Sequence, residues 1–324
     1  MFYRPFIKLY FYIIVLTPLF LNGCVKFWLG TPELGSKALP IEFYLDNSNS
    51  LINEEAASAS LQSCIEEKTG YRIHFNFAPD EKAVISALAR GNAQFGVMSS
   101  MGYISASTRT SLKSVLIFSK KGIATTRSVI LGKSSIWKTY FQKAGLALNQ
   151  FTFHHDALIS YFNNSTVAYI DPENIIGFYL PRMYFLQRNI FPNAAIFVGS
   201  YNSVLDSLNE NLATIGVVSE NFIDTKFPNS TPIKLGSQFS DYIVLGISQN
   251  LPGNVITANQ GTPNFITQAI MKGFDLCSQS KASDFRKIFD ADGVLKSNEK
   301  QFIFTKELYN FQQENIRILT QRNQ

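Results

Sequence analysis

One stretch of the chain carries residue types suited to binding a small anion. From Ala168 to Arg182 it reads AYIDPENIIGFYLPR. Its first residues favour a β-strand, Asp171-Pro172 ends that strand, and Asn174 is a good N-cap for a following helix. The free amides at a helix start and the positive end of the helix dipole attract negative charge. The junction therefore predicts an anion-binding site, although strand–turn–helix junctions also occur as purely structural elements.

The elements that position this junction alternate between strand and helix, which is typical of an α/β protein. In the first part of the chain, strands are expected at 41–45, 71–77, 95–98, 114–118 and 127–131, and helices at 51–68, between Asp80 and Gly91, and from Ser99 onward.

The rest of the chain repeats the theme. Strands are expected at 167–170, 195–198, 213–218 and 242–247, and helices at 137–144, 175–188, 200–208, 262–277, 283–289 and 306–319. Pro181 should bend or divide the helix that contains it. Residues 146–164 carry no clear signal and are predicted to form a surface insertion.

The composition is that of a folded protein with enough residues for two lobes. The chain has 324 residues, of which 46% are hydrophobic and 16% charged, with 28 Phe and 14 Tyr. These values exclude a disordered chain. The net charge is only +5, and no basic run exceeds Lys120-Lys121, so no nucleic-acid partner is expected.

The N-terminus has the features of a bacterial lipoprotein signal. Arg4 and Lys8 precede an apolar stretch from Leu9 to Leu21, and Leu21-Asn22-Gly23-Cys24 resembles a lipobox. We expect a signal peptide over 1–24, lipidation of Cys24, a flexible tether over 25–40, and a body held at the periplasmic side of a bacterial membrane. The alternative is an uncleaved membrane anchor.

Two further cysteines, Cys64 and Cys277, lie on helices expected in the same lobe. An extracytoplasmic compartment permits a disulfide between them. Two inert buried thiols are the alternative.

Several segments, taken in order, resemble one known family. They are Ile65–Ile73, Ala83–Gly91, Phe95–Ala106, the Asp171–Arg182 junction with its Gly177 and Pro181, and Val198–Leu205. Together they resemble the periplasmic phosphate/phosphite/phosphonate-binding proteins that serve ABC importers, over roughly residues 41–280.

The resemblance implies a two-lobed periplasmic binding protein-like fold. Each lobe would hold a mixed β-sheet flanked by helices, with a ligand cleft between the lobes that closes by hinge motion. Lobe one would comprise 41–130 plus 241–324, and lobe two 131–240, with crossings near 126–132 and 240–248. The implied partners are a small anionic ligand and an ABC permease and ATPase; a monomer without cofactor is expected.

The resemblance and the helix starts together indicate candidate ligand-binding residues. They are Asp46, Ser99, Ser100 and Tyr103 from lobe one, with Asn47 beside Asp46, and Asn174, Tyr201, Asn202 and Glu220 from lobe two. Tyr103 matches the family's ligand-facing aromatic residue. The alternative is structural, because Ser99, Asn174 and Ser200 would also serve as ordinary N-caps and Tyr103 as the edge of a core.

Five residues at three places differ from the family's ligand site. The family typically has hydroxyl residues at Asn174-Ile175-Ile176, often His at Tyr201, and an aromatic residue at Glu81. Losing hydroxyl donors changes which ligand is bound without changing the fold. Two functions are therefore weighed: a solute-binding lipoprotein for import, and a lipoprotein that uses the same fold as a sensor or protein-interaction module.

Other chemistries find little support in the sequence. His154-His155-Asp156 is the only clustered metal-like set, and adjacent residues point different ways in regular structure. No GxSxG, HExxH or GxxxxGK[ST] signature is present. An enzyme would need an acid–base pair such as Asp171 with Glu220 in the cleft. We expect no enzyme, no catalytic residue and no metal.

Overall fold

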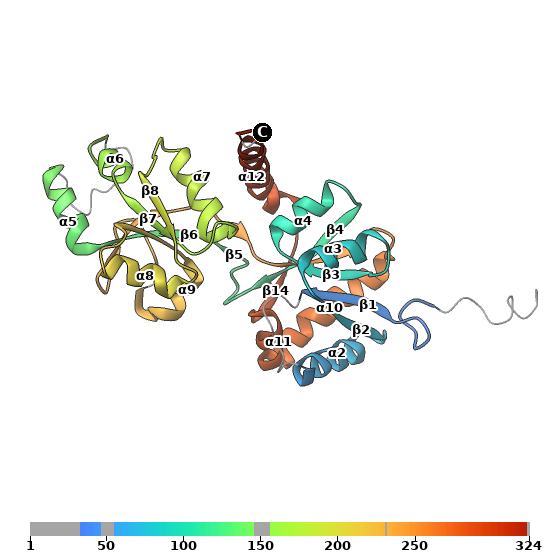
Figure 1. Cartoon of the computed structure of the whole chain (residues 1–324). Helices are drawn as coiled ribbons and strands as arrows, with labels where there is room; N and C mark the ends of the chain where they lie inside the picture. The colour runs from blue at the N-terminus through green and yellow to red at the C-terminus, as the bar shows by residue number, and fades with distance from the viewer. Residues whose placement is uncertain (1–32, 47–54, 146–155, 231, 323–324) are drawn as a thin grey trace, which may run out of the picture.

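A computed structural model describes residues 33–46, 55–145, 156–230 and 232–322. The chain folds into two lobes, each built on a six-stranded sheet, with a small two-stranded sheet between them (Figure 1). The predicted signal peptide, Cys24, Asn47 and the histidine pair at 154–155 lie outside the described residues. Among the described residues, no helix combines the length and the apolar character needed to cross a membrane.

The first lobe contains a sheet in the order β14-β4-β13-β3-β1-β2. The strands are β1 (Ile41–Asp46), β2 (Ile73–Ala78), β3 (Phe95–Met98), β4 (Leu112–Ser119), β13 (Val255–Asn259) and β14 (Gly293–Lys296). Apolar side chains cover both faces. One face packs on α2 (Glu55–Thr69), α10 (Asn264–Ser280) and α11 (Ala282–Phe289), and the other on α3 (Glu81–Ala89) and α4 (Ser100–Ser107).

The second lobe contains a sheet in the order β10-β11-β6-β9-β7-β8. The strands are β6 (Ser128–Lys133), β7 (Thr166–Tyr169), β8 (Ala194–Phe197), β9 (Ile215–Ser219), β10 (Gln238–Phe239) and β11 (Tyr242–Ile247). One face packs on α5 (Ser134–Lys143), α6 (Asp156–Asn163) and α7 (Leu180–Leu186), and the other on α8 (Tyr201–Asn209) and α9 (Glu220–Lys226).

The two sheets follow the same plan. In each, three strands run parallel, β2-β1-β3 in one and β8-β7-β9 in the other. A strand that arrives directly from the other lobe is then added antiparallel to the third: β13 beside β3, and β6 beside β9. Each sheet therefore includes a strand that begins just after the chain has crossed from the other lobe. The crossing segments thus lead directly into both sheets.

The crossings are displaced from the stretches expected for them and overlap these only at 126–127 and 248. Strands β6 and β11 pair with each other antiparallel within the second sheet, and their apolar side chains are buried in the cores on its two faces. The chain instead crosses at 120–127 and 248–254, where β5 (Thr125–Thr126) and β12 (Leu251–Pro252) pair antiparallel. These paired segments connect the two lobes.

The folded part also begins earlier than the predicted end of the tether. Residues 33–40 form a turn against lobe one, in which Leu34 packs on the core and Gly35 (φ +87°) lies against Tyr71. A Cβ at Gly35 would lie 2.5 Å from the Tyr71 ring, so a side chain does not fit there. The part of the predicted tether over 33–40 is therefore structured.

One further sequence expectation changes and another is confirmed. The predicted insertion over 146–164 contains a helix, α6, whose Leu158 and Phe162 are buried in the second core. The helix expected over 175–188 is divided as predicted at Pro181, into a π-helix, η2 (Ile175–Tyr179), and α7.

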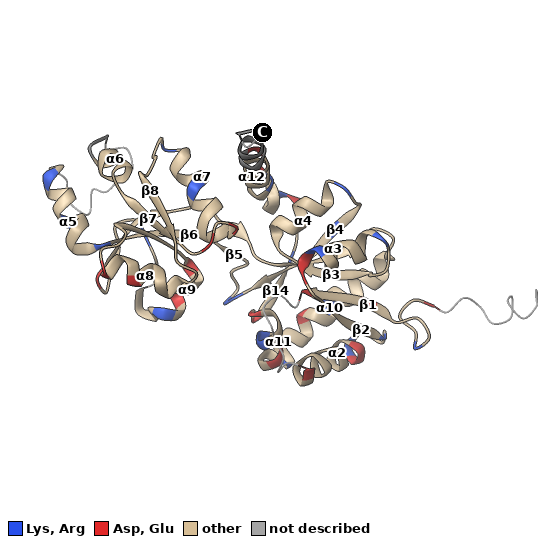
Figure 2. Cartoon of the chain, viewed as in Figure 1, with Lys and Arg blue, Asp and Glu red and all other residues tan. Residues whose placement is uncertain are grey.

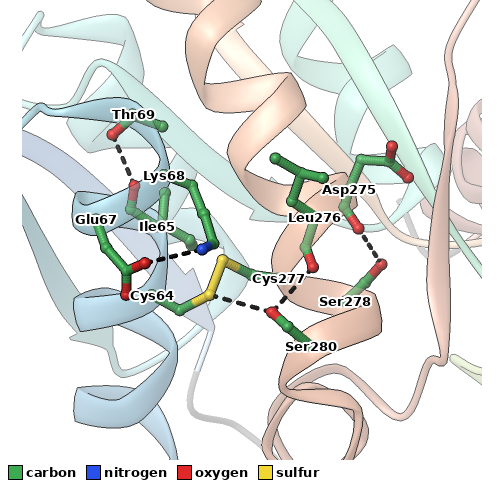
Figure 3. Close-up of a disulfide and its surroundings, with 10 residues drawn as sticks. All are labelled: Cys64, Ile65, Glu67, Lys68, Thr69, Asp275, Leu276, Cys277, Ser278 and Ser280. Atoms are coloured by element: carbon green, nitrogen blue, oxygen red, sulfur yellow. Dashed lines mark hydrogen bonds and ion pairs between the residues drawn. A yellow bond between two sulfur atoms is a disulfide. The ribbon is translucent and has the colours of Figure 1, made fainter.

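A disulfide joins Cys64 on α2 to Cys277 on α10, with the two Cα atoms 6.1 Å apart (Figure 3). The bridge spans 213 residues of sequence. Because α2 precedes and α10 follows the entire second lobe, it joins the two halves of the chain from which lobe one is built.

Candidate functional site

The predicted ligand residues follow the carboxyl ends of the parallel strands, where binding sites in open α/β sheets are typically found. Asp46 ends β1, and Ser99 follows β3 at the start of α4. Asn174 precedes η2 after β7, and Glu220 begins α9 after β9. A surface hollow of about 540 Å³, lined by residues 107–113 and Gln260, lies at the other end of α4 and is separate from this site.

The serines at the start of α4 are both hydrogen-bonded within the chain. Ser99 is the N-cap, and its hydroxyl oxygen accepts from the amide of Gly102 at 2.9 Å. The buried Ser100 hydroxyl donates to the carbonyl of Pro252 at 2.8 Å. Since Pro252 lies on β12, this bond fixes the start of α4 to the second crossing.

Glu81, the first residue of α3, reaches the same helix start. Its carboxylate accepts from the amide of Ser99, and Gly102 leaves space for it. Burial raises the pKa of the Glu81 carboxyl above its ordinary value; hydrogen bonds from Ser99 lower the pKa in part, and the nearby Asp46 raises it further. Sequence reasoning noted Glu81 as a departure from the family without assigning it to the site.

The raised pKa of Glu81 predicts a pH-dependent effect of the isosteric variant Glu81→Gln. A raised pKa in the folded state means that the stability from this group is complete below its unfolded pKa, near 4.3, and is lost as pH rises through the folded pKa. We therefore expect Glu81→Gln to gain stability over the wild type as pH rises from about 4 to 7. Urea midpoints measured at each pH test this, and a constant difference would contradict it.

Tyr103 lies deeper than a ligand-facing residue would. Its side chain is 4% exposed and belongs to a core cluster, with its ring centroid 4.9 Å from that of Phe302. Residue 103 lies on the side of α4 that packs in the core, not at the first residues of the helix, where a ligand would be bound. The position favours the structural alternative, and ligand contact by Tyr103 stays a prediction.

The Asp171–Arg182 junction forms a π-helix at the point where sequence predicted a helix start. The Asn174 side chain accepts from the amide of Gly177 at 2.6 Å, and the Ser128 hydroxyl donates to the carbonyl of Ile176. A Cβ at Gly177 would lie 2.1 Å from Cγ2 of Ile170, so this close turn requires glycine. Asn174 thus acts as the cap that its residue type predicted, and π-helices are frequent at functional sites.

The two isoleucines of this junction lie in an apolar cluster between the lobes. Met101 from α4, Leu180 from α7, Leu251 from β12 and Leu308 from α12 (Ile303–Arg322) are its buried members. Ile175 and Ile176 pack against these, together with side chains of α12, which lies beside both lobes (Figure 1). The starts of α4 and η2 are therefore held together near the crossings by apolar contact.

The remaining candidates in lobe two are also engaged. Glu220 accepts two hydrogen bonds from the guanidinium of Arg127, at 2.6 and 2.9 Å. Asn202 accepts from the ammonium of Lys226. Burial raises the pKa of Tyr201, and a hydrogen bond with Ser219 lowers it in part. Arg127 was missed by sequence reasoning, because nothing local links it to a residue 93 positions away.

The structure thus places the predicted polar residues near the facing ends of the two sheets, with an internal partner for most of them, whereas Tyr103 lies in the core of lobe one. Asp171 and Glu173, directly before η2, are exposed and add negative charge there. Within the described ranges, no group of three or more His, Cys, Asp or Glu could hold a metal ion.

The sequence matches a protein family described as the phosphonate periplasmic substrate-binding proteins of ABC transporters, over residues 49–299. No curated protein matches the sequence.

Solved structures similar to this fold include Mh-p37 from Mycoplasma hyorhinis, with a TM-score of 0.59 and 10% identity over 84% of this chain and 97% of that one. PhnD1 from Prochlorococcus marinus, in complex with methylphosphonate, has a TM-score of 0.56 and 11% identity over 87% and 99%. The periplasmic aliphatic sulphonate binding protein SsuA from Escherichia coli has 0.52 and 11% over 88% of both chains. At these identities the likeness shows the fold alone.

Proposed function

Since the chain belongs to the phosphonate family of periplasmic substrate-binding proteins of ABC transporters, we propose that it captures a small solute with an anionic group between its lobes. Closure about the two crossings would then present the solute to an ABC permease and ATPase. The family acts outside the cytoplasm and binds solutes rather than transforming them.

One observation carries the proposal. Helix starts from the two lobes, α4 after β3 and η2 after β7, approach each other beside the crossings, where Met101, Ile175 and Ile176 share one cluster. A solute bound there would contact both lobes at once, so its binding energy would favour the closed arrangement.

The anionic character of the solute is supported by relatives and by lobe two. The similar folds include one with methylphosphonate bound and one that binds aliphatic sulphonates. In lobe two, α8 begins after the carboxyl end of the parallel strand β8, with Ser200 as its side-chain N-cap and no acidic residue in its first turn. Helix starts in this arrangement favour a negatively charged group.

We further propose that Cys24 carries the lipid anchor and that the protein works as a monomer held at the periplasmic side of the membrane. The Leu21–Cys24 pattern supports the anchor. Mass spectrometry of the protein from its native membrane tests it, since a peptide beginning at a diacylated Cys24 is expected.

The binding function is tested by a thermal-shift screen of the full-length protein in detergent. The probes are phosphate, phosphite, methylphosphonate, aliphatic sulphonates and small carboxylates. The carboxylates include some with a longer chain that carries an amino or hydroxyl group. A ligand present at 100 times its dissociation constant stabilises by about 2.7 kcal/mol, which is a readily measured shift. Small-angle scattering should then show a smaller radius of gyration with the best probe.

A second function, as a sensor or interaction module, is favoured by a specific observation. The family's hydroxyl positions are Asn174, Ile175 and Ile176 here, and the isoleucines lie in the apolar cluster between the lobes. No shift and no compaction with any probe would overturn the importer proposal and leave this second function.

A further inference from the structure

The start of α4 in lobe one is already occupied by a negative charge of the chain itself. Glu81 lies on α3, and its carboxylate accepts the amide hydrogen of Ser99, the N-cap of α4. The Ser99 hydroxyl in turn accepts from the amide of Gly102. These are the amides that a bound anion at a helix start would use.

Gly102 provides independent support for this placement. A Cβ at position 102 would lie 2.4 Å from Cδ of Glu81 and 2.5 and 2.6 Å from its two oxygens. Nothing about the backbone of position 102 demands glycine, because it lies within a regular helix. The missing side chain therefore makes room for the carboxylate.

We propose that Glu81 is a specificity-determining residue, which excludes an anionic group from the lobe-one side of the site by occupying the start of α4. The proposal rests on the proposed function, and it narrows the ligand. The anionic group of the solute would be received by lobe two, while the part that faces lobe one would be neutral or positively charged.

The surrounding charges point the same way. Asp46, at the end of β1, is close enough to Glu81 to act on it electrostatically, and acidic ribbon segments are visible around the start of α3 (Figure 2). The two carboxylates, Asp46 and Glu81, repel an incoming anion from this side of lobe one.

The position of Glu81 favours an elongated ligand over a compact anion. A compact anion such as inorganic phosphate has one charged group, which would have to face both lobes at the same time. Glu81 would repel that group from one side. An elongated solute, with its anionic group at one end only, can contact both lobes without placing its charge against Glu81.

The test uses inorganic phosphate and methylphosphonate as probes at pH 7.5, with Glu81→Gln and Glu81→Ala in the full-length protein. Glu81→Gln keeps the shape of the side chain and removes its charge, while Glu81→Ala also frees the Ser99 amide. We expect roughly a tenfold or greater gain in phosphate affinity in Glu81→Ala, and a smaller gain in Glu81→Gln, by calorimetric titration.

Glu210→Gln is the matched control, because it makes the same change in net charge at an exposed position at the end of α8. It should bind phosphate as weakly as the wild type. Equal phosphate affinity in the wild type and both Glu81 variants would overturn the proposal, as would an equal gain in the control.

The two proposals fail in different ways. If the wild type responds to an elongated anion and the Glu81 variants gain no phosphate affinity, the binding function stands and the role of Glu81 is wrong. If the wild type binds no solute, the importer function fails, while a phosphate gain confined to the Glu81 variants would still show that Glu81 blocks the helix start. Circular dichroism confirms that each variant is folded.

Discussion

Reduction of the Cys64–Cys277 disulfide should lower the free energy of unfolding by about 2 to 5 kcal/mol. In the chain-entropy model the loss grows with the length of the closed loop and is about 5 kcal/mol for loops longer than 100 residues. The loop here spans 213 residues and contains the whole second lobe. The expected loss is therefore near the upper end of what one bridge can contribute.

The surroundings of the bridge support this size of effect. Cys64 is 4% exposed and Cys277 is fully buried, in the core cluster that α2 and α10 form on the sheet. Gly273 on α10 lies against Ile65 and Thr69 of α2, so the helices approach closely one turn from the bridge. Figure 3 shows the two helices side by side at this point. Two thiols would keep these apolar contacts and lose only the covalent constraint.

Urea unfolding with and without reductant measures the effect. The double variant Cys64→Ser/Cys277→Ser is the control, because its midpoint should not respond to reductant. An unchanged midpoint in the reduced wild type would contradict the prediction.

The sequence predicted best those elements whose signals are local. Helix α3 lies between an N-cap, Asp80, whose side chain accepts from the Ala83 amide at 2.8 Å, and Gly91 in the left-handed region. The division at Pro181 was likewise predictable from one residue. Strand β13 was missed, because VITAN is a short run whose role depends on the chain returning from lobe two to pair with β3 and β4.

The same distinction between local and distant contacts applies to the residues of the candidate site. Capping by Ser99 and Asn174 was foreseen as an alternative role, since a cap binds an amide three residues away. The bond from Ser100 to Pro252 joins residues 152 positions apart, and the Arg127–Glu220 pair joins residues 93 apart. No periodicity or motif encodes such contacts, so which polar groups are already engaged could be seen only in the folded chain.

The second large effect is expected in lobe two, where Trp137→Ala should lower the free energy of unfolding by about 3 to 5 kcal/mol. Trp137 is fully buried, with its ring centroid 4.7 Å from that of Phe162, and its Nε1 donates to the carbonyl of Thr214 at 2.9 Å. A Cβ at Gly132 would lie 2.1 Å from the indole, so β6 itself packs directly on the ring. Truncation leaves a cavity that a strand backbone cannot fill.

Trp137→Phe is the matched variant, since it keeps an aromatic ring in the core and removes the hydrogen bond to Thr214 together with a smaller part of the buried volume. It should lose roughly 1 to 3 kcal/mol, the range for a buried carbonyl left without its donor. The two lobes have separate cores, so hydrogen exchange of Trp137→Ala should show lost protection in β6, β9 and β11 while β1 and β3 keep theirs. Equal loss in both sheets would instead mean that the paired crossings and the apolar cluster around Met101 make the lobes unfold as one unit, and the disulfide would then stabilise lobe two as strongly as lobe one.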